Sequence, residues 1–194
     1  MQCNAVQCSA ASEMSVSTTN FGFSSKCFEV FSVIFFISQK FGFEFELVDD
    51  TYNANPDSVR AAIDVLAGLP GPRLLVLGDM GEVGSNGPQF HAEAGAYARA
   101  VGIETLFTLG ELSKVASEAF EITGTGGHWQ TMEALQKGVV EVLPQYRSVL
   151  VKGSRFMKME KIVEAVMAVG QGAHTHHTVV SSKSARASME APCS

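Results

Sequence analysis

LVDDTYNANPDS, residues 47–58, passes from an apolar start through two acids into a pattern typical of a helix N-terminus. Asn55 is a good N-cap residue, because its side-chain oxygen can accept a hydrogen bond from a free amide of the first turn. Pro56 suits the first helical position, where its missing N–H is no loss. Asp57 places negative charge near the positive end of the helix dipole. The segment therefore predicts a strand, a polar turn and a helix in succession.

The polar turn is a candidate ligand site, because ligands of open α/β sheets bind beyond the carboxyl ends of strands. The helix after it has an apolar stripe at Val59, Ala62, Ile63 and Leu66. The turn holds more hydrogen-bonding groups than a plain connection requires, although a capped turn with solvated acids is the alternative. The candidate residues are Asp49, Asp50, Tyr52, Asn53 and Asn55.

Strand and helix patterns alternate along the rest of the chain. Apolar runs predict strands at residues 41–48, 73–78, 103–109, 124–129 and 148–151. Helical spacing predicts helices at residues 90–101, with Phe90, Ala94, Tyr97 and Val101 on one face, at 111–120 and 132–143, and along the stripe Met159, Ile162, Val163, Val166 and Met167. No hairpin signal separates the strands, so we expect an α/β fold with a mostly parallel sheet and helices on both faces.

Composition and patterning divide the chain into three parts. Residues 1–40 are unassigned and we expect them to be poorly ordered apart from one apolar stretch, residues 27–37, which is too short for a transmembrane helix. Residues 41–170 form the expected domain, and residues 171–194 are predicted to be a disordered tail. The net charge of −6 does not suggest a nucleic-acid partner. The four cysteines show no zinc or disulfide spacing, and the histidines at 174, 176 and 177 are expected to be solvated, so we predict no metal site.

Three motifs, DDTYNANPDS, VLGDMGEVG and VLVKGSRFMKME, resemble the C-terminal domain of the Mur ligases in order and spacing. The resemblance covers roughly residues 47–169 and implies a Rossmann-like open sheet. It also implies a cytoplasmic, ATP-dependent ligase of peptidoglycan precursor synthesis, one that adds D-alanyl-D-alanine to UDP-N-acetylmuramoyl-tripeptide. In such an enzyme ATP activates the tripeptide carboxylate as an acyl phosphate, which the amine of D-alanyl-D-alanine attacks.

The chain departs from this family in one respect. It contains no G-x-x-x-x-G-K-[ST] sequence, so no phosphate-binding loop for ATP hydrolysis. In the family that loop and most Mg contacts belong to a central domain expected upstream. We therefore predict no catalytic residue here and no activity of the chain alone; a truncated gene or a faulty gene model would explain the short N-terminal segment. A stand-alone nucleotide- or amino-acid-binding module and a non-functional gene fragment remain alternatives.

The nucleotide-binding candidates lie in the first motif. A carboxylate at the end of a strand can accept hydrogen bonds from ribose hydroxyls, and the resemblance gives Asp50 this role toward ATP. Tyr52 can stack on a base, and the amides of Asn53 and Asn55 can read purine edges. For Asn55 the N-cap role alone is a sufficient explanation.

The substrate-binding candidates lie in the other two motifs. Asp79, Glu82 and His91 form one group of candidates. Asp79 could bind a ligand or cap a turn, and His91 is expected to be an ordinary surface or core histidine. Lys152, Gly153, Ser154 and Arg155 form KGSR, with Ser154 as a possible cap of a following helix whose N-terminus could bind anions. Lys152 and Arg155 could grip the carboxylate of D-alanyl-D-alanine, or could be solvated loop residues.

Overall fold

The computed structural model describes residues 34–37, 45–120 and 125–170. The predicted disordered tail and most of the unassigned N-terminal segment lie outside these residues, so the proposed domain boundaries stay a prediction. Among the described residues, no helix is long and apolar enough to cross a membrane.

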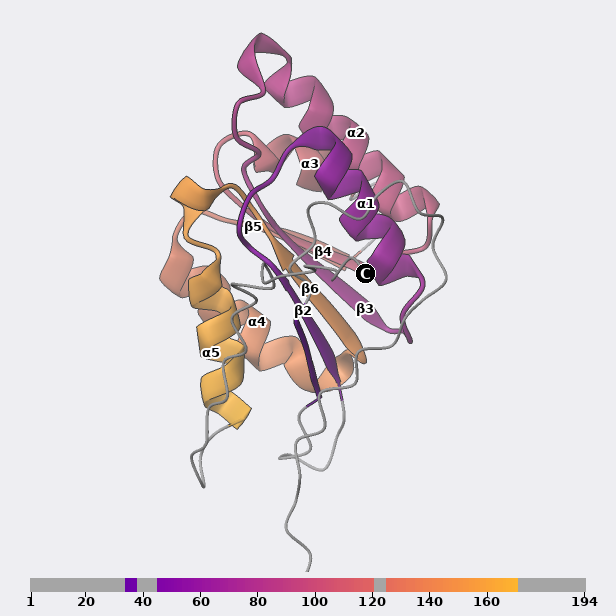
Figure 1. Cartoon of the computed structure of the whole chain (residues 1–194), viewed down its shortest axis with the longest axis vertical. Helices are drawn as coiled ribbons and strands as arrows, with labels where there is room; N and C mark the ends of the chain where they lie inside the picture. Colours follow the sequence, from indigo (N-terminus) through magenta and orange to yellow (C-terminus); the bar gives the residue numbers. More distant parts are fainter. Residues whose placement is uncertain (1–33, 38–44, 121–124, 171–194) are drawn as a thin grey trace, which may run out of the picture.

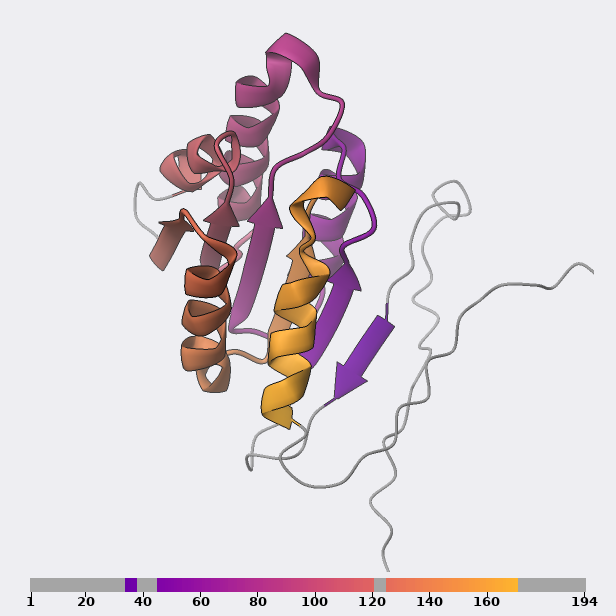
Figure 2. The same ribbon diagram turned by 90° about the vertical axis from the view of Figure 1, so that its left-hand side faces the viewer.

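Six strands form one sheet in the order β1-β2-β6-β3-β4-β5. Five of them run parallel, and β1 pairs antiparallel with β2 at one edge, as Figure 2 shows. This confirms the predicted mostly parallel α/β sheet. The strands are β1 Ile34–Ile37, β2 Glu46–Asp50, β3 Arg73–Gly78, β4 Thr105–Leu109, β5 Thr125–Trp129 and β6 Ser148–Lys152.

Helices cover both faces of the sheet, as predicted (Figure 1). One face carries α1 Pro56–Ala67, α2 Gly87–Ala100 and α3 Ser113–Phe120. The other carries α4 Met132–Val142 and α5 Glu160–Gly170. Three short 3-10 turns complete the described elements: η1 Gly84–Asn86, η2 Leu143–Gln145 and η3 Arg155–Met157.

Alternate residues of the central strands build two cores, because successive side chains of a strand point to opposite faces. Leu74 and Val76 pack on the α4–α5 side, whereas Leu75 and Leu77 pack on the α1–α3 side. Burying each such side chain contributes roughly 1.5–3 kcal/mol relative to exposure. The predicted stripe of α1 is confirmed, since all four of its apolar residues are buried.

Two predicted elements begin elsewhere than expected. Strand β2 starts at Glu46 and continues to Asp50, whereas the prediction ended it at Val48. Helix α2 starts at Gly87 instead of Phe90, because Pro88 occupies a first-turn position where proline is well tolerated. Its most buried face holds His91, Gly95 and Ala98, and the predicted stripe lies only partly buried beside it. A Cβ at Gly95 would collide with the Ala116 carbonyl, so glycine permits the close contact of α2 with α3.

The parallel strands bring their carboxyl ends to one edge, which we call the ligand edge. It consists of the loop after β2 (residues 51–55), the loop after β3 (79–83), the turn after β4 (110–112) and the segment after β6 (153–159). The residues that the sequence singled out lie in these segments or at the ends of the strands that lead into them, except His91 on α2.

Candidate functional site

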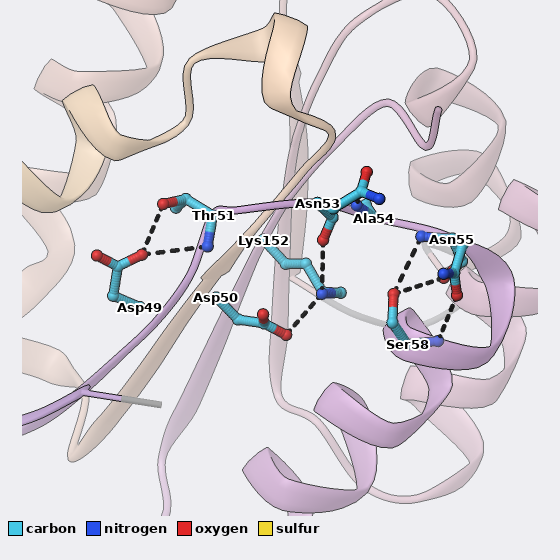
Figure 3. A network of polar contacts seen from close by, with 8 residues as sticks. All are labelled: Asp49, Asp50, Thr51, Asn53, Ala54, Asn55, Ser58 and Lys152. Carbon is cyan, nitrogen blue, oxygen red and sulfur yellow. Dashed lines mark hydrogen bonds and ion pairs between the residues drawn. The ribbon is translucent and has the colours of Figure 1, made fainter. Parts of the chain in front are cut away.

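The loop after β2 is fixed by its own side chains (Figure 3). Asn55 caps α1: its Oδ1 accepts the Ser58 N–H at 2.8 Å, and Ser58 Oγ in turn accepts the Asn55 N–H at 3.0 Å. One step earlier, Asp49 Oδ1 accepts both the backbone N–H and the hydroxyl of Thr51, at 3.1 and 2.7 Å. The N-cap prediction is thus confirmed, and these hydrogen bonds fix the loop at both of its ends.

A buried ion pair joins the loop after β2 to strand β6. Lys152 Nζ lies 2.6 Å from Asp50 Oδ2, and the two side chains are only 1% and 7% exposed. The same ammonium donates to the Asn53 carbonyl oxygen at 2.9 Å. Burial raises the pKa of Asp50 and lowers the pKa of Lys152, while each charge partly offsets the shift of the other. The pair therefore binds two segments that lie 102 residues apart in the sequence.

This geometry brings together two residues that the sequence placed in different subsites. Asp50 was predicted to contact ribose and Lys152 to contact a carboxylate, yet they contact each other. The Lys152 ammonium faces inward to Asp50 and to the Asn53 carbonyl (Figure 3). A direct ligand contact by Lys152 stays a prediction.

A second, exposed cation lies close to an aromatic ring. The guanidinium carbon of Arg155 is 5.2 Å from the centroid of the Tyr52 ring, within the range of a cation–π contact. Tyr52 is 68% exposed, and the neighbouring Phe156 is 66% exposed. Among the described residues these are the large apolar side chains that are exposed. The segments after β2 and β6 thus offer aromatic and cationic groups to solvent.

The loop after β3 connects these two segments. The Asp79 carbonyl oxygen accepts the Ser154 N–H at 3.0 Å and the Ser154 hydroxyl at 2.6 Å. Two residues on, Gly81 N–H donates to the Ala54 carbonyl oxygen at 2.9 Å. The prediction that Ser154 caps a helix is wrong, because its hydroxyl is engaged by Asp79 and makes no cap bond.

The Asp79 side chain takes the capping role that the sequence left open. Its Oδ1 accepts the Ser113 N–H at 2.7 Å, at the start of α3. Gly110 faces this carboxylate with φ +124°, and a Cβ there would collide with the Asp79 oxygens. The carboxylate therefore joins β3 to α3, and its role as a substrate contact stays a prediction.

The segment after KGSR also differs from expectation. Arg155–Met157 form the turn η3, and α5 begins only at Glu160, so no α-helix N-terminus follows Ser154 directly. Gly153 is required sterically, because a Cβ there would approach Met159 Cγ to 2.5 Å and Gly78 Cα to 3.3 Å. The segment is thus pressed against the end of β3, which fixes the place from which Arg155 extends.

Sequence reasoning missed Phe156 and Gly81 as members of this site. A Cβ at Gly81 would lie 3.3 Å from Ser154 Cβ, 3.8 Å from Phe156 Cε1 and 4.0 Å from Asn53 Oδ1. Gly81 therefore leaves space where three segments converge. The available signal was an aromatic residue directly after KGSR, a position with no apolar periodicity to explain it.

The donor set at the ligand edge fits parts of a nucleotide better than it fits a metal ion. An exposed aromatic face, a guanidinium and the exposed Asn53 side chain suit a planar base with polar edges. In residues 34–37, 45–120 and 125–170, no group of three or more His, Cys, Asp or Glu side chains could hold a metal. These exposed groups therefore suit a planar ligand with polar edges better than they suit a metal ion.

Comparison with known proteins agrees with this architecture. The model of the family described as Mur ligase, glutamate ligase domain, matches residues 38–155. UDP-N-acetylmuramoyl-tripeptide--D-alanyl-D-alanine ligase of Escherichia coli (strain K12) is 39% identical over 126 residues, which are 64% of this chain and 27% of that protein. The protein of the same name from Bacillus subtilis (strain 168) is 36% identical over 124 residues, 61% of this chain and 27% of that protein.

Solved structures show the same fold. A crystal structure of MurF from Acinetobacter baumannii matches with a TM-score of 0.59 at 32% identity, covering 64% of this chain and 28% of that one. MurF ligase from Thermotoga maritima in complex with ADP matches with a TM-score of 0.56 at 24% identity, covering 69% and 30%.

The comparisons match only part of the known ligases. The chain spans about a quarter of the length of the curated relatives it matches. The family match begins before β2 and continues to Arg155, so it includes the first three segments of the ligand edge and the start of the fourth. The chain therefore belongs to the Mur ligase family and carries its glutamate ligase domain, the C-terminal domain of the MurF structures.

Proposed function

We propose that this chain supplies the C-terminal domain of an ATP-dependent ligase that adds D-alanyl-D-alanine to UDP-N-acetylmuramoyl-tripeptide. The observation that carries the proposal is the pairing of a buried scaffold with an exposed recognition surface at one edge of the sheet. The identity to curated ligases of that name supports the choice of substrates. Cytoplasmic location follows from the same proposal, because the substrates are precursors made inside the cell.

For the nucleotide, we assign the base to the Tyr52 ring and the Asn53 side chain. Both residues are exposed, so neither must leave a core to meet a ligand, and Asn53 would use its side-chain NH2 because its Oδ1 accepts the Ala54 N–H at 2.8 Å. Asp50 would serve the ribose through the carboxylate oxygen other than Oδ2, the atom that contacts Lys152. The Asn55 side chain is committed to Ser58, so its contribution is to fix the start of α1.

For the incoming dipeptide, we assign the carboxylate chiefly to Arg155. Its guanidinium is exposed and could form two parallel hydrogen bonds with a carboxylate. Gly153 and Ser154 hold this segment against β3 and the Asp79 carbonyl, which sets the origin of the arginine side chain. Lys152 and Asp79 then support the site through their neighbours.

The contribution of these residues to the reaction is positioning. ATP would activate the tripeptide carboxylate as an acyl phosphate, and the dipeptide amine would attack it. No phosphate-binding loop occurs in this sequence, so the phosphates and Mg would be held by another domain. Holding nucleotide and dipeptide at one edge reduces the entropic cost of bringing them together, which can be worth several kcal/mol of barrier.

The test compares the chain alone with a chimera. Residues 34–170 would replace the C-terminal domain of the E. coli relative, and phosphate release would be followed with UDP-muramoyl-tripeptide and D-alanyl-D-alanine. We expect no turnover by the chain alone and dipeptide-dependent turnover by the chimera. The E. coli protein truncated before its C-terminal domain is the control. A folded but inert chimera, or turnover by the chain alone, would contradict the proposal.

A further inference from the structure

His91 is fully buried on α2 and uses both ring nitrogens. Nε2 lies 3.0 Å from the Met80 backbone nitrogen, and Nδ1 lies 2.7 Å from the Gly87 carbonyl oxygen. A backbone N–H can only donate and a carbonyl can only accept. The ring is therefore an acceptor at Nε2 and a donor at Nδ1, which defines the neutral tautomer with its proton on Nδ1.

The partner of His91 lies at the centre of the ligand edge. Met80 stands between Asp79, whose carbonyl holds Ser154, and Gly81, whose N–H holds Ala54. The segment 79–81 thus touches the segments that carry Tyr52 and Arg155, and His91 joins that segment to α2. A shift at Met80 would be passed to both neighbours through these backbone hydrogen bonds.

The backbone just after this segment is strained, which shows that its conformation is imposed from outside. Glu82 has φ 56°, in the left-handed region that residues with a side chain adopt at a cost. Such a conformation persists only where surrounding contacts determine it. The His91–Met80 and Gly81–Ala54 hydrogen bonds hold the two residues directly before Glu82.

We propose that His91 is a positioning residue of the ligand edge, acting as the Nδ1-protonated neutral imidazole that fixes the 79–81 segment between the Tyr52 and Arg155 segments. His91 touches no ligand in this role. The consequence for ligand binding rests on the proposed function, whereas the effect on the segment does not.

The experiment uses the full 194-residue chain and three variants. His91→Gln keeps one acceptor and one donor at a similar separation, and His91→Leu fills the space with neither. His128→Gln is the matched control, because His128 is a partly buried histidine that hydrogen-bonds to Thr108 on β4 and interacts with the 79–81 segment only through the charge of Asp79. Nitrogen-15 spectra of the ring report the tautomer, and amide hydrogen exchange reports the segment, with Leu75 and Val76 of β3 as internal reference.

We expect the wild-type His91 ring to carry its proton on Nδ1. In His91→Leu, exchange at Met80 and Gly81 should become at least about fivefold faster relative to the β3 reference, because the Met80 N–H loses its acceptor. His91→Gln should restore most of the protection, and His128→Gln should leave it unchanged. A proton on Nε2, unchanged exchange in His91→Leu, or failure of His91→Gln to restore protection would each overturn the proposal.

An ADP titration followed by amide shifts separates this proposal from the function. If the wild type binds ADP, His91→Leu should bind it several-fold more weakly and His91→Gln nearly as well as the wild type. Equal affinity of all three would overturn a role in the site. If the wild type binds no ADP, the assignment of the nucleotide fails, and the exchange data still decide whether His91 positions the segment.

Discussion

Two cations of the KGSR motif connect the same two segments in opposite environments. Lys152 is 1% exposed and is held by Asp50 Oδ2 at 2.6 Å and by the Asn53 carbonyl. Arg155, three residues later, is exposed and lies over the exposed Tyr52 ring at 5.2 Å. One contact is internal and the other faces solvent.

The difference in burial separates scaffold from recognition surface. A buried charge that loses its partner keeps the cost of its desolvation, so we expect the Asp50–Lys152 pair to stay intact when a ligand binds. An exposed cation–π contact is worth only about 0.5–1 kcal/mol and can be exchanged for a ligand contact. Two residues of one short motif can therefore have different roles: the buried one stabilises the site, and the exposed one can contact a ligand.

Removing one member of the buried Asp50–Lys152 pair should have the largest effect on stability. Lys152→Met leaves Asp50 buried without a partner, and we expect it to lower the free energy of unfolding by about 3–5 kcal/mol. Urea denaturation followed by circular dichroism measures this. Lys137→Met, an exposed position on α4, is the control and should change stability by less than about 0.5 kcal/mol.

A double-mutant cycle measures how strongly Asp50 and Lys152 depend on each other. Lys152→Met combined with Asp50→Leu removes both charges, so the double variant should lose clearly less stability than the two single losses added together. Additive losses would mean that the two side chains do not act as a pair.

Removing the exposed Arg155 guanidinium should leave stability nearly unchanged and weaken ligand binding. Arg155→Ala should change the unfolding free energy by less than about 1 kcal/mol. In the chimera it should raise the apparent constant for D-alanyl-D-alanine by a factor of roughly 10 to 150, the cost of a lost charge-assisted hydrogen bond. The constant for ATP serves as the internal control, and an equal rise in both constants would refute the assignment of Arg155 to the dipeptide.

Tyr52 tests the aromatic half of the exposed contact. Tyr52→Ala should raise the apparent constant for ATP in the chimera by a factor of roughly 2 to 12, as expected for the loss of one stacking contact. Tyr52→Phe keeps the ring and should stay within about twofold of the wild type. If Tyr52→Ala leaves the ATP constant unchanged, the base does not stack on this ring.

Substituting the partly buried His128 should give the smallest effect on stability. The effect is a change in how the free energy of unfolding depends on pH. Burial and the charge of Lys114 lower the pKa of His128 from its usual 6.5. The unfolded chain then binds more protons than the folded chain just below pH 6.5, so the stability from this group is complete above 6.5 and is lost as pH falls toward the folded-state pKa. His128→Gln should reduce the slope of stability against pH between about 7 and 5. An unchanged slope would show that other groups cause it.

Local patterns predicted most of the fold, because apolar periodicity and caps depend on neighbours in the sequence. Strand 73–78, the stripe of α1 and the N-cap Asn55 are found as predicted. The Asp50–Lys152 pair could not be predicted in this way, because it depends on β2 and β6 being adjacent in the sheet across 102 residues. The contact of Ser154 with Asp79 has the same origin, since β3 and β6 are also neighbours.

The sequence also could not predict which side chains of the ligand edge point inward and which point to solvent. From the sequence alone, Lys152 and Arg155 were equally good candidates to bind a carboxylate, because both follow the predicted strand 148–151 and carry positive charge. Only the pairing of the strands turns Lys152 inward, and only η3 carries Arg155 and Phe156 outward.

We expect ligands to contact mainly the outward-facing groups of the ligand edge, and to meet the buried pair only at the Asp50 carboxylate oxygen that does not contact Lys152. An amide-shift titration of the full chain with ADP, and then with D-alanyl-D-alanine, tests it most directly. We predict perturbations clustered at Tyr52, Asn53, Gly81 and Arg155 that are lost in Tyr52→Ala/Arg155→Ala. Perturbations centred instead on the opposite edge, around Arg73 and Glu104, or unchanged shifts in the double variant, would show that the ligands do not bind at the ligand edge.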